Sequence, residues 1–151
     1  MPIKVAIIDD KASNRNILND KLKRGGFFEI VFTAEDGKDF LQKMKSLKPE
    51  QLPDVALMDL EMPNMDGVDA IAAGSSFFPT VKFVVLTIFD DEEKIFKAIK
   101  AGAFGYLLKE ESAENISEML LQMHESGVGP VSPGIAHKML QLVQNNELTI
   151  V

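Results

Sequence analysis

Five short and nearly uninterrupted apolar runs, separated by amphipathic segments, constrain the fold of this chain more than any other feature. The runs are IKVAII, FEIVFTA, VALM, FVVL and FGYLL. They are mostly continuous rather than alternating, which is typical of strands buried on both faces of a parallel sheet. The segments between them carry apolar residues at helical spacing. The sequence therefore predicts a doubly wound α/β domain, with a five-stranded parallel sheet and helices on both of its faces.

Length and composition favour one compact domain. A chain of 151 residues buries roughly two-thirds of the surface that it exposes when unfolded, which leaves no room for a second full domain. The sequence has no signal-peptide pattern, no cysteine and no apolar stretch near the ~20 residues that cross a bilayer, so we expect a cytoplasmic protein without membrane contact. The net charge of −7 argues against nucleic acid binding by this chain itself, since phosphate backbones need a basic footprint.

Polar residues predict where the helices begin. Ser13 is expected to cap the first helix and Asp36 to precede the second. A short third helix is expected from Gly67 to about Ala73, a fourth after the acidic run 90–93, and a fifth at Ser112. The residues expected to face inward are Ile17, Leu18 and Leu22 in the first helix, Phe40, Leu41, Met44 and Leu47 in the second, Ile95, Phe96 and Ile99 in the fourth, and Ile116, Met119, Leu120 and Met123 in the fifth.

A Gly/Pro-rich break, ESGVGPVSPG, follows the fifth helix and begins a C-terminal segment, residues 127–151. Ser132 and Pro133 are expected to start a sixth helix in this segment. Its apolar stripe consists of Ile135, Met139, Leu142 and Val143. Such a stripe needs a partner surface, so we expect the helix to pack either on its own domain or on a second copy of the chain, as in a homodimer.

Polar residues end four of the five apolar runs. Asp9 and Asp10 follow the first run, Asp59 follows the third, Thr87 ends the fourth, and Lys109 follows the fifth. In open α/β sheets, ligands bind beyond the carboxyl ends of the strands, so we expect these five side chains to meet at one edge. Adjacent aspartates repel each other, and a divalent cation between them makes their clustering tolerable.

This set of side chains fits phosphoryl chemistry. Three carboxylates form an oxygen-only ligand set suited to Mg²⁺, which accepts one or two carboxylates and keeps several waters. Lys109 adds a positive charge for Asp59 or for a ligand oxygen. An oxygen nucleophile, Mg²⁺, an ammonium and a hydroxyl are recurring parts of phosphoryl-transfer sites. The pattern therefore predicts a Mg²⁺ site with room for a phosphoryl group.

Four motifs, VAIIDD, VALMDLEMPNMDG, VVLTIFDD and KAGAFGYLLKE, resemble the receiver domain of two-component response regulators over about residues 3–126. The resemblance implies the flavodoxin-like strand order 2-1-3-4-5. It also implies a switch that assists its own phosphorylation and dephosphorylation and is not a conventional enzyme. The implied roles are phosphoacceptor for Asp59, Mg²⁺ ligands for Asp9 (directly or through water), Asp10, Asp59 and the backbone carbonyl of Glu61, phosphoryl-oxygen ligands for Thr87 and Lys109, and a phosphorylation-dependent rotamer change for Tyr106.

The sequence KAGAFGYLLKE, with SAEN and SPGIAHKML after it, is most similar to the NarL/LuxR subfamily. In that subfamily a linker helix leads to a helix-turn-helix DNA-binding domain, which usually begins near a Leu-Thr pair such as Leu148-Thr149. The resemblance implies a histidine kinase or phosphotransfer protein as partner, and transcription as the output through a DNA-binding domain beyond this chain. A stand-alone receiver is the alternative.

Two positions depart from the usual receiver pattern. Ile88 follows the switch threonine, where a small residue is common, and is expected to restrict access for water and small phosphodonors. Glu110 follows Lys109 in place of a frequent proline, so no cis-proline forms there. Tyr106 fits a half-buried aromatic without a switching role as well as it fits a switch.

Two other classes of protein remain as alternatives. An aspartate-nucleophile phosphatase also places an aspartate at a strand end, and DLE at 59–61 loosely resembles its DxD motif. However, Glu61 stands where a second aspartate is expected, and the length leaves no room for a cap domain. A flavodoxin-like FMN carrier shares the predicted fold but needs a neutral phosphate-binding loop after the first strand. DDKASN places two negative charges there instead.

Overall fold

The computed structural model describes residues 2–145 and contains one five-stranded parallel sheet. The strands lie in the order β2-β1-β3-β4-β5, which confirms the predicted topology. Leu148 and Thr149 lie outside the described residues. The strands are β1 (Ile3–Ile8), β2 (Phe28–Ala34), β3 (Val55–Met58), β4 (Lys82–Thr87) and β5 (Gly105–Leu108). The helices are α1 (Ala12–Lys23), α2 (Gly37–Lys45), α3 (Gly67–Phe77), α4 (Glu92–Ala101), α5 (Ala113–Ser126) and α6 (Pro133–Gln144), with a 3₁₀ turn at Pro49–Gln51.

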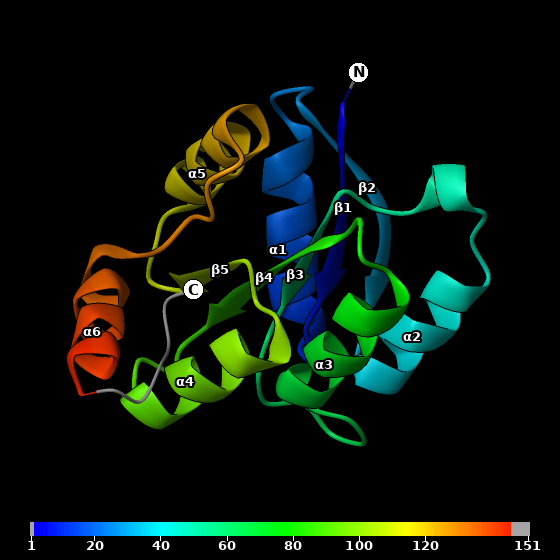
Figure 1. Cartoon of the computed structure of the whole chain (residues 1–151). Coiled ribbons are helices and arrows are strands. Elements are labelled where there is room, and N and C mark those ends of the chain that lie inside the picture. The colour runs from blue at the N-terminus through cyan, green and yellow to red at the C-terminus, as the bar shows by residue number, and fades with distance from the viewer. Residues whose placement is uncertain (1, 146–151) are drawn as a thin grey trace.

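Helices cover both faces of the sheet (Figure 1), with α1 and α5 on one face and α2, α3 and α4 on the other. Successive residues of each strand point to opposite faces, so β1 contributes Val5 and Ile7 to the core under α1 and α5, and Ala6 and Ile8 to the other core. This double burial explains why the strands appear as continuous apolar runs. The two cores together hold the strand ends in a fixed relation.

The first helix begins one residue before the predicted cap. Lys11 is the N-terminal flanking residue of α1, and Ser13 lies inside the helix and caps nothing, so that prediction was wrong. The backbone N–H of Lys11 donates to Asp9 Oδ1 at 2.9 Å, and Arg15 N donates to Lys11 O at 3.1 Å. The Asp9 carboxylate therefore closes the turn after β1, and the helix starts earlier as a result.

Two further expectations about the helices were wrong. Ile17 is 56% exposed, whereas Leu18 and Leu22 are buried, because the inward stripe of α1 is narrower than predicted. Helix α3 continues to Phe77 instead of ending near Ala73. Gly74, inside this helix, lies against the sheet, where an added Cβ would come within 2.5 Å of the Phe83 ring. This glycine permits close helix–sheet packing and does not end the helix.

The C-terminal segment packs on its own domain. Before α6, Val131 lies alongside β5 in a parallel bridge with Tyr106. Tyr106 N donates to Pro130 O at 2.9 Å, and Ser132 N donates to Tyr106 O at 3.1 Å. Figure 1 shows α6 next to α4, beyond the β5 edge of the sheet. Within the described residues, the apolar stripe of α6 is therefore covered by the same chain.

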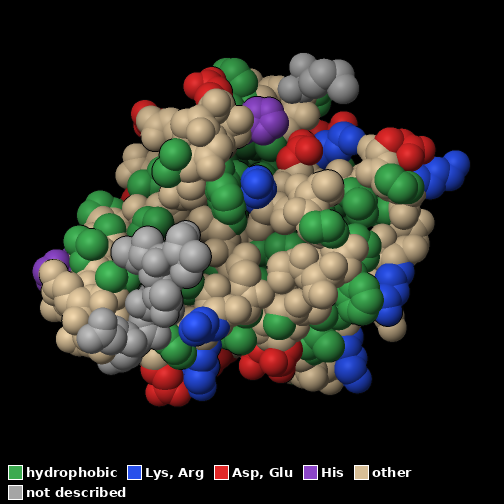
Figure 2. Space-filling view, viewed as in Figure 1, with side chains coloured by type: hydrophobic (Ala, Val, Ile, Leu, Met, Phe, Trp, Pro, Cys, Tyr) green, Lys and Arg blue, Asp and Glu red, His purple; other side chains and the backbone are tan. Residues whose placement is uncertain are grey.

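The surface carries charges of both signs. On the face seen in Figure 2, acidic and basic side chains are interspersed, and no broad area of one sign appears. This face therefore shows no basic patch of the kind that binds nucleic acid. Among residues 2–145, no helix combines the length and apolarity that a membrane crossing requires.

Candidate functional site

The structure brings together the three aspartates that the sequence singles out. Asp9 and Asp10 follow β1, and Asp59 follows β3, the strand paired with β1. One carboxylate oxygen from each lies within 4.8 Å of the others. Asp9 and Asp59 are buried, whereas Asp10 is exposed. Two of these carboxylates therefore lie in the floor of the site, and the third faces solvent.

Lys109 joins the two buried carboxylates. Its Nζ lies 2.7 Å from Asp9 Oδ2 and 2.8 Å from Asp59 Oδ2. Burial of the ammonium works to lower the pKa of Lys109, but the hydrogen bonds to Asp59 and Asp9 outweigh burial and hold it above the usual value. The side chain therefore stays charged at neutral pH. One ammonium for three carboxylates leaves the site with excess negative charge, which favours a cation.

Each buried aspartate is oriented by a second set of donors. Asp59 Oδ1 accepts a hydrogen bond from Leu60 N at 2.8 Å. Asp9 accepts from Lys11 N at 2.9 Å and from Asn14 Nδ2 at 3.4 Å. These backbone and amide donors stabilise the ionised carboxylates and hold their oxygens in place. Asn14 was not predicted from the sequence, where its position one turn beyond Asp10 is the only signal for it.

Thr87 lies at the carboxyl end of β4, beside the Asp59 strand in the sheet order. Its side chain is fully buried, and its Oγ1 has no hydrogen-bond partner among the described residues. A buried hydroxyl without a partner is costly. The Thr87 hydroxyl is therefore available to donate a hydrogen bond to an oxygen of a bound ligand.

Tyr106 is buried in β5, with 2% of its surface exposed. Its hydroxyl donates to Phe89 O at 2.7 Å, in the loop that leads from Thr87 into α4. Burial, with a smaller contribution from Asp91 and other nearby acids, raises the pKa of Tyr106, so the hydroxyl remains a donor at neutral pH. The expectation of a half-buried ring was wrong, because the segment before α6 covers this edge of the sheet.

Glu61 lies in the loop between β3 and α3. Its side chain is exposed and pairs with Lys94 of α4 at 3.4 Å. Asp10 and Glu61 line one hollow at the surface, together with Met62, Pro63 and Asp66. Glu61 thus borders the same hollow as the solvent-facing Asp10. Its side chain points to a different partner, which agrees with a carbonyl rather than a carboxylate role.

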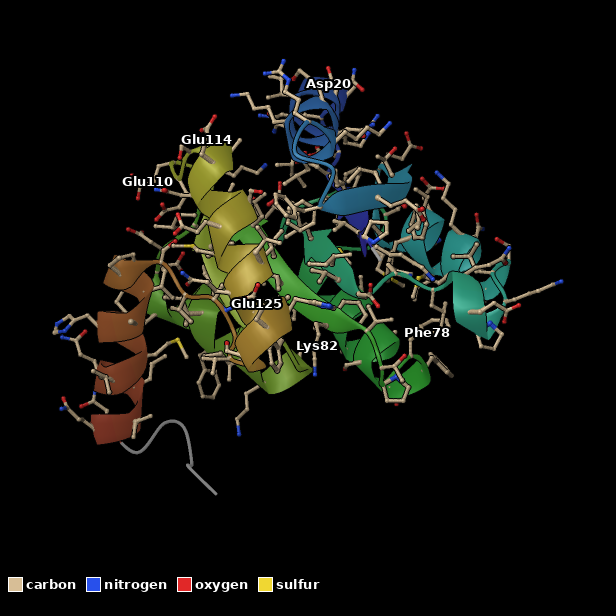
Figure 3. All side chains as sticks on the ribbon, turned by 90° about the horizontal axis from the view of Figure 1, so that it is seen from above. Asp20, Phe78, Lys82, Glu110, Glu114 and Glu125 are labelled. Carbon is tan, nitrogen blue, oxygen red and sulfur yellow. The ribbon has the colours of Figure 1, made fainter. Side chains whose placement is uncertain are left out.

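A cavity of about 260 Å³ opens beside the aspartates, between α1 and α5. Asp59 and Lys109 line its polar end, and Ile17, Leu18 and Ile116 are among its apolar lining. In Figure 3, which shows α1 and α5 from above, Glu110 and Glu114 point outward at the start of α5. The exposed Ile17 thus borders the site. Ile88, which follows Thr87 at the end of β4, is 71% exposed.

The donor set fits Mg²⁺. All three side chains offer hard carboxylate oxygens, one of them open to water, and no histidine or cysteine takes part. The neighbouring Thr87 hydroxyl and Lys109 ammonium offer donors to an anion that the cation would accompany. These groups are arranged for an oxyanion beside a divalent cation, as in phosphoryl-transfer sites.

Comparison with known proteins agrees with this arrangement. Residues 5–121 match the family model described as the response regulator receiver domain. The transcriptional regulatory protein LnrK of Bacillus subtilis (strain 168) is 35% identical over 138 residues, which cover 91% of this chain and 60% of that protein. The oxygen regulatory protein NreC of Staphylococcus epidermidis is 39% identical over 115 residues, 76% of this chain and 51% of that protein. The chain thus spans about half to three-fifths of the length of these relatives.

A solved structure supports the same relationship. The signal receiver domain of the putative response regulator NarL from Mycobacterium tuberculosis has a TM-score of 0.75 and 30% identity, and covers 83% of this chain and 98% of its own. These matches confirm the resemblance to the NarL/LuxR subfamily and do not favour a phosphatase or an FMN carrier. On this likeness in sequence, topology and strand-end chemistry, the chain belongs to the response regulator receiver domain family.

Proposed function

We propose that this chain is a phosphorylation switch that takes a phosphoryl group onto Asp59 from a histidine kinase or a phosphotransfer protein. The observation that carries the proposal is the contact of the Lys109 ammonium with Asp59 at 2.8 Å and Asp9 at 2.7 Å, beside an unpartnered Thr87 hydroxyl. This arrangement offers a nucleophilic oxygen, a cation site and two donors for phosphoryl oxygens within one strand-end cluster. The family match over residues 5–121 supports the same function.

The chemistry of the transfer is simple. An oxygen of the Asp59 carboxylate attacks the phosphorus of a phosphohistidine, and a new O–P bond forms as the P–N bond breaks. The imidazole keeps the electron pair of the broken bond and then binds a proton. Lys109 and Thr87 donate hydrogen bonds to the phosphoryl oxygens, and this positioning and charge neutralisation provide most of the catalysis. The domain thereby assists its own phosphorylation and its later hydrolysis by water, without being a conventional enzyme.

Asp9, Asp10, Asp59 and the backbone carbonyl of Glu61 would hold Mg²⁺ in this proposal, with Asp9 binding directly or through water. Bound Mg²⁺ would neutralise the negative charge on the phosphoryl oxygens. Asp10 is the exposed member of the cluster, so it is accessible for cation entry. Ile88 directly follows Thr87 and is 71% exposed; in this proposal its side chain would slow the access of water and of small phosphodonors.

The switch follows from the unpartnered hydroxyl of Thr87. A phosphoryl group on Asp59 draws this hydroxyl inward and moves the loop after β4 with it. Tyr106 is bonded to Phe89 O in that loop, so its rotamer and the α4–β5–α5 surface respond. The shift is limited to the differential stabilisation by the phosphoryl group, about 1 to 3 kcal/mol for coupled sites.

The phosphodonor would approach along the cavity between α1 and α5. Ile17 is 56% exposed and lines this cavity next to Asp59, so it offers an apolar contact close to the reacting oxygen. Replacing Ile17 by alanine should slow transfer from a protein donor and leave transfer from a small phosphodonor unchanged. Phe77, which is 68% exposed on α3, is the matched surface control.

The surrounding organisation is also part of the proposal. Residues 3–126 act as the receiver, and residues 127–151 as linker and C-terminal helix. LnrK is named as a transcriptional regulatory protein, and both LnrK and NreC are longer than this chain, which supports a transcriptional output through a DNA-binding domain. A cytoplasmic location is part of the same proposal. A homodimer would form by surfaces other than the apolar stripe of α6, which α4 already covers.

The test is intact-protein mass spectrometry after incubation with a small phosphodonor such as acetyl phosphate, with Mg²⁺ or with EDTA. We expect one added phosphoryl group only with Mg²⁺, and its loss on treatment with hydroxylamine, which cleaves acyl phosphates. No mass increase with either a small donor or a phosphohistidine donor would overturn the proposal. Solution NMR with beryllofluoride and Mg²⁺ tests the switch, because the signals of Thr87 and Tyr106 should then move.

A further inference from the structure

The loop between β3 and α3, residues 60–66, is closed at its base by backbone contacts. Gly67 N donates to Leu60 O at 2.7 Å. An added Cβ at Gly67 would come within 2.0 Å of Asp59 O, so only glycine allows this approach. The loop therefore leaves and rejoins the sheet edge at Asp59 itself, and any change in its shape is felt next to the phosphoacceptor candidate.

The tip of the same loop has a rare backbone conformation. Asn64 has φ +67°, and it is the only non-glycine residue with positive φ among residues 2–145. Asparagine adopts this left-handed conformation more readily than most residues. Met65 N donates to Pro63 O at 2.7 Å, which makes the turn around Asn64 tight. Such a conformation persists only where neighbouring contacts hold it.

Those contacts come from the beginning of α2. Asn64 Nδ2 donates to Asp36 Oδ2 at 2.8 Å, and the other oxygen of Asp36 accepts from Asp39 N at 2.8 Å. Gly37 N donates to Met65 O at 3.0 Å, and a Cβ at Gly37 would lie 2.7 Å from Met65 Cγ. Asp36 is only 5% exposed. The Asp36 carboxylate is thus shared between capping α2 and holding the loop tip.

The same contacts lead back to the aspartate cluster. Asp36 lies two residues beyond Ala34, whose carbonyl accepts from Asp9 N at 3.0 Å. On the other side, the loop carries Glu61, which lines one hollow with Asp10. Asp36 and Asn64 therefore link the segment after β2, which accepts a hydrogen bond from Asp9 N, to the loop that bears Glu61. The sequence separation of 28 residues means that this link exists only in the folded domain.

We propose that Asp36 and Asn64 form a clamp that sets the position of the Glu61 backbone relative to the aspartates, and that both are positioning residues for Mg²⁺ binding. The inference rests on the proposed function, because it assumes that the cluster binds Mg²⁺. Outer residues that orient metal ligands commonly change metal affinity at least tenfold when replaced. The clamp orients a whole loop, and its effect reaches the metal through the Glu61 carbonyl.

The test measures Mg²⁺ affinity by isothermal titration calorimetry, with no phosphodonor present. Asp36→Asn retains one oxygen that can cap α2. The second oxygen is replaced by an NH₂ group, which cannot accept the hydrogen bond from the Asn64 amide. Asn64→Ala and Asn64→Gly both remove the hydrogen bond, and only the second tolerates positive φ without strain. We expect the dissociation constant for Mg²⁺ to rise about tenfold in Asp36→Asn and Asn64→Ala, and about fivefold or more in Asn64→Gly.

Two control variants separate the clamp from charge and from the Glu61 side chain. Asp39→Asn removes the same charge three residues further along the chain, in the first turn of α2, and Lys94→Gln removes the ion pair with the Glu61 side chain without changing Glu61 itself. Both should bind Mg²⁺ within about twofold of the wild type. If Asp39→Asn weakened binding as much as Asp36→Asn, the effect would be electrostatic and the clamp would be wrong.

The outcomes distinguish this inference from the proposed function. A wild-type chain that binds no Mg²⁺ refutes the proposed metal site, whereas a wild type that binds and clamp variants with equal affinity refute the clamp alone. Folding is checked by thermal melting. If Asn64→Ala fails to fold, Asp36→Asn and Asn64→Gly decide the question. A second readout is the NMR amide shifts of Glu61 and Met62 without metal, which should move in Asp36→Asn and remain in place in Asp39→Asn.

Discussion

The carboxyl edge of the sheet and the corner formed by α4, β5 and α6 contribute to stability in opposite directions. At the edge, three carboxylates lie within 4.8 Å of one another, and the Lys109 ammonium pairs with two of them, Asp9 and Asp59. At the corner, Ile135 and Leu142 of α6 are fully buried in the core that contains Ile95 and Ala98 of α4. Charge density at the edge opposes folding, whereas apolar burial at the corner favours it.

The two regions also differ in how their buried polar groups are satisfied. At the corner, the segment before α6 extends the sheet, and Leu108 N donates to the buried Ser132 Oγ at 3.1 Å. Polar groups there find partners within the chain. At the edge, the Thr87 hydroxyl does not find one among the described residues. The edge therefore retains binding capacity at a cost in stability, and substitutions in the two regions should affect different properties.

The largest effect is expected at the edge. Asp59→Asn should abolish phosphoryl uptake, because an amide is a poor nucleophile and lacks the charge that helps to bind Mg²⁺. Asp66→Asn is the matched control, since Asp66 caps α3 through Asp69 N and asparagine caps equally well. Intact mass after incubation with acetyl phosphate measures both variants. Wild-type uptake by Asp59→Asn would refute the assignment of the phosphoacceptor.

The corner should respond in stability rather than in chemistry. Leu142→Ala removes a fully buried side chain and should lower the free energy of unfolding by about 2 to 4 kcal/mol. Leu140→Ala, on the same helix but 60% exposed, should change it by less than about 0.5 kcal/mol. Urea unfolding measures both. Equal effects of the two variants would mean that α6 does not pack on α4 in solution.

Asp10→Ala should separate binding from stability at the edge. We expect Mg²⁺ affinity to fall about tenfold or more, because one of three carboxylates is lost. The free energy of unfolding without metal should be unchanged or slightly higher, since repulsion among the carboxylates is relieved. Calorimetric titration and urea unfolding give the two quantities. A clear loss of stability without metal would contradict the view that this cluster opposes folding.

Tyr106→Phe tests the connection between the two regions. The substitution keeps the buried ring and removes the hydroxyl that bonds Phe89 O at 2.7 Å, so it should cost about 1 kcal/mol of stability. It should also reduce the shift that beryllofluoride with Mg²⁺ causes in the amide signals of residues 88–90. The same shifts in wild type and variant would indicate that the loop moves independently of Tyr106.

The smallest expected effect is the contribution of Asp36 to the pH dependence of stability. Hydrogen bonds from Asp39 N and the Asn64 amide hold the pKa of Asp36 below its usual value of 3.8. A lowered pKa in the folded state stabilises the protein above the unfolded pKa, and this contribution is lost as pH falls through the lower folded value. Carboxyl NMR titration should show the low pKa in the wild type and a higher one in Asn64→Ala. An unchanged pKa in that variant would refute the role of Asn64.

Much of the fold follows from local sequence patterns. Continuous apolar runs predicted the five buried strands, and the second and fifth helices begin after Asp36 and at Ser112 as expected, where each of these residues caps its helix. The two helix boundaries that were predicted wrongly depend on contacts that helix propensity does not describe. Ser13 was displaced as a cap because the Asp9 carboxylate bonds Lys11 N, and Gly74 proved to be a contact point with Phe83. Helix propensity does not distinguish these cases, because the first depends on a side-chain hydrogen bond from Asp9 in the preceding turn and the second on a contact that forms only when α3 packs on the sheet.

The sequence by itself determined which residues could reach the carboxyl edge, because parallel strands place all their C-terminal residues on one side of the sheet. Asp9, Asp10, Asp59 and Lys109 were predicted in this way. Only the tertiary structure decided how Lys109 divides its contacts between Asp9 and Asp59, that Asn64 reaches Asp36 across 28 residues, and that α6 covers α4 of its own domain. The continuous apolar runs indicate a parallel sheet from local sequence alone. The three contacts, in contrast, join residues that come close only once the sheet and both helical layers have formed.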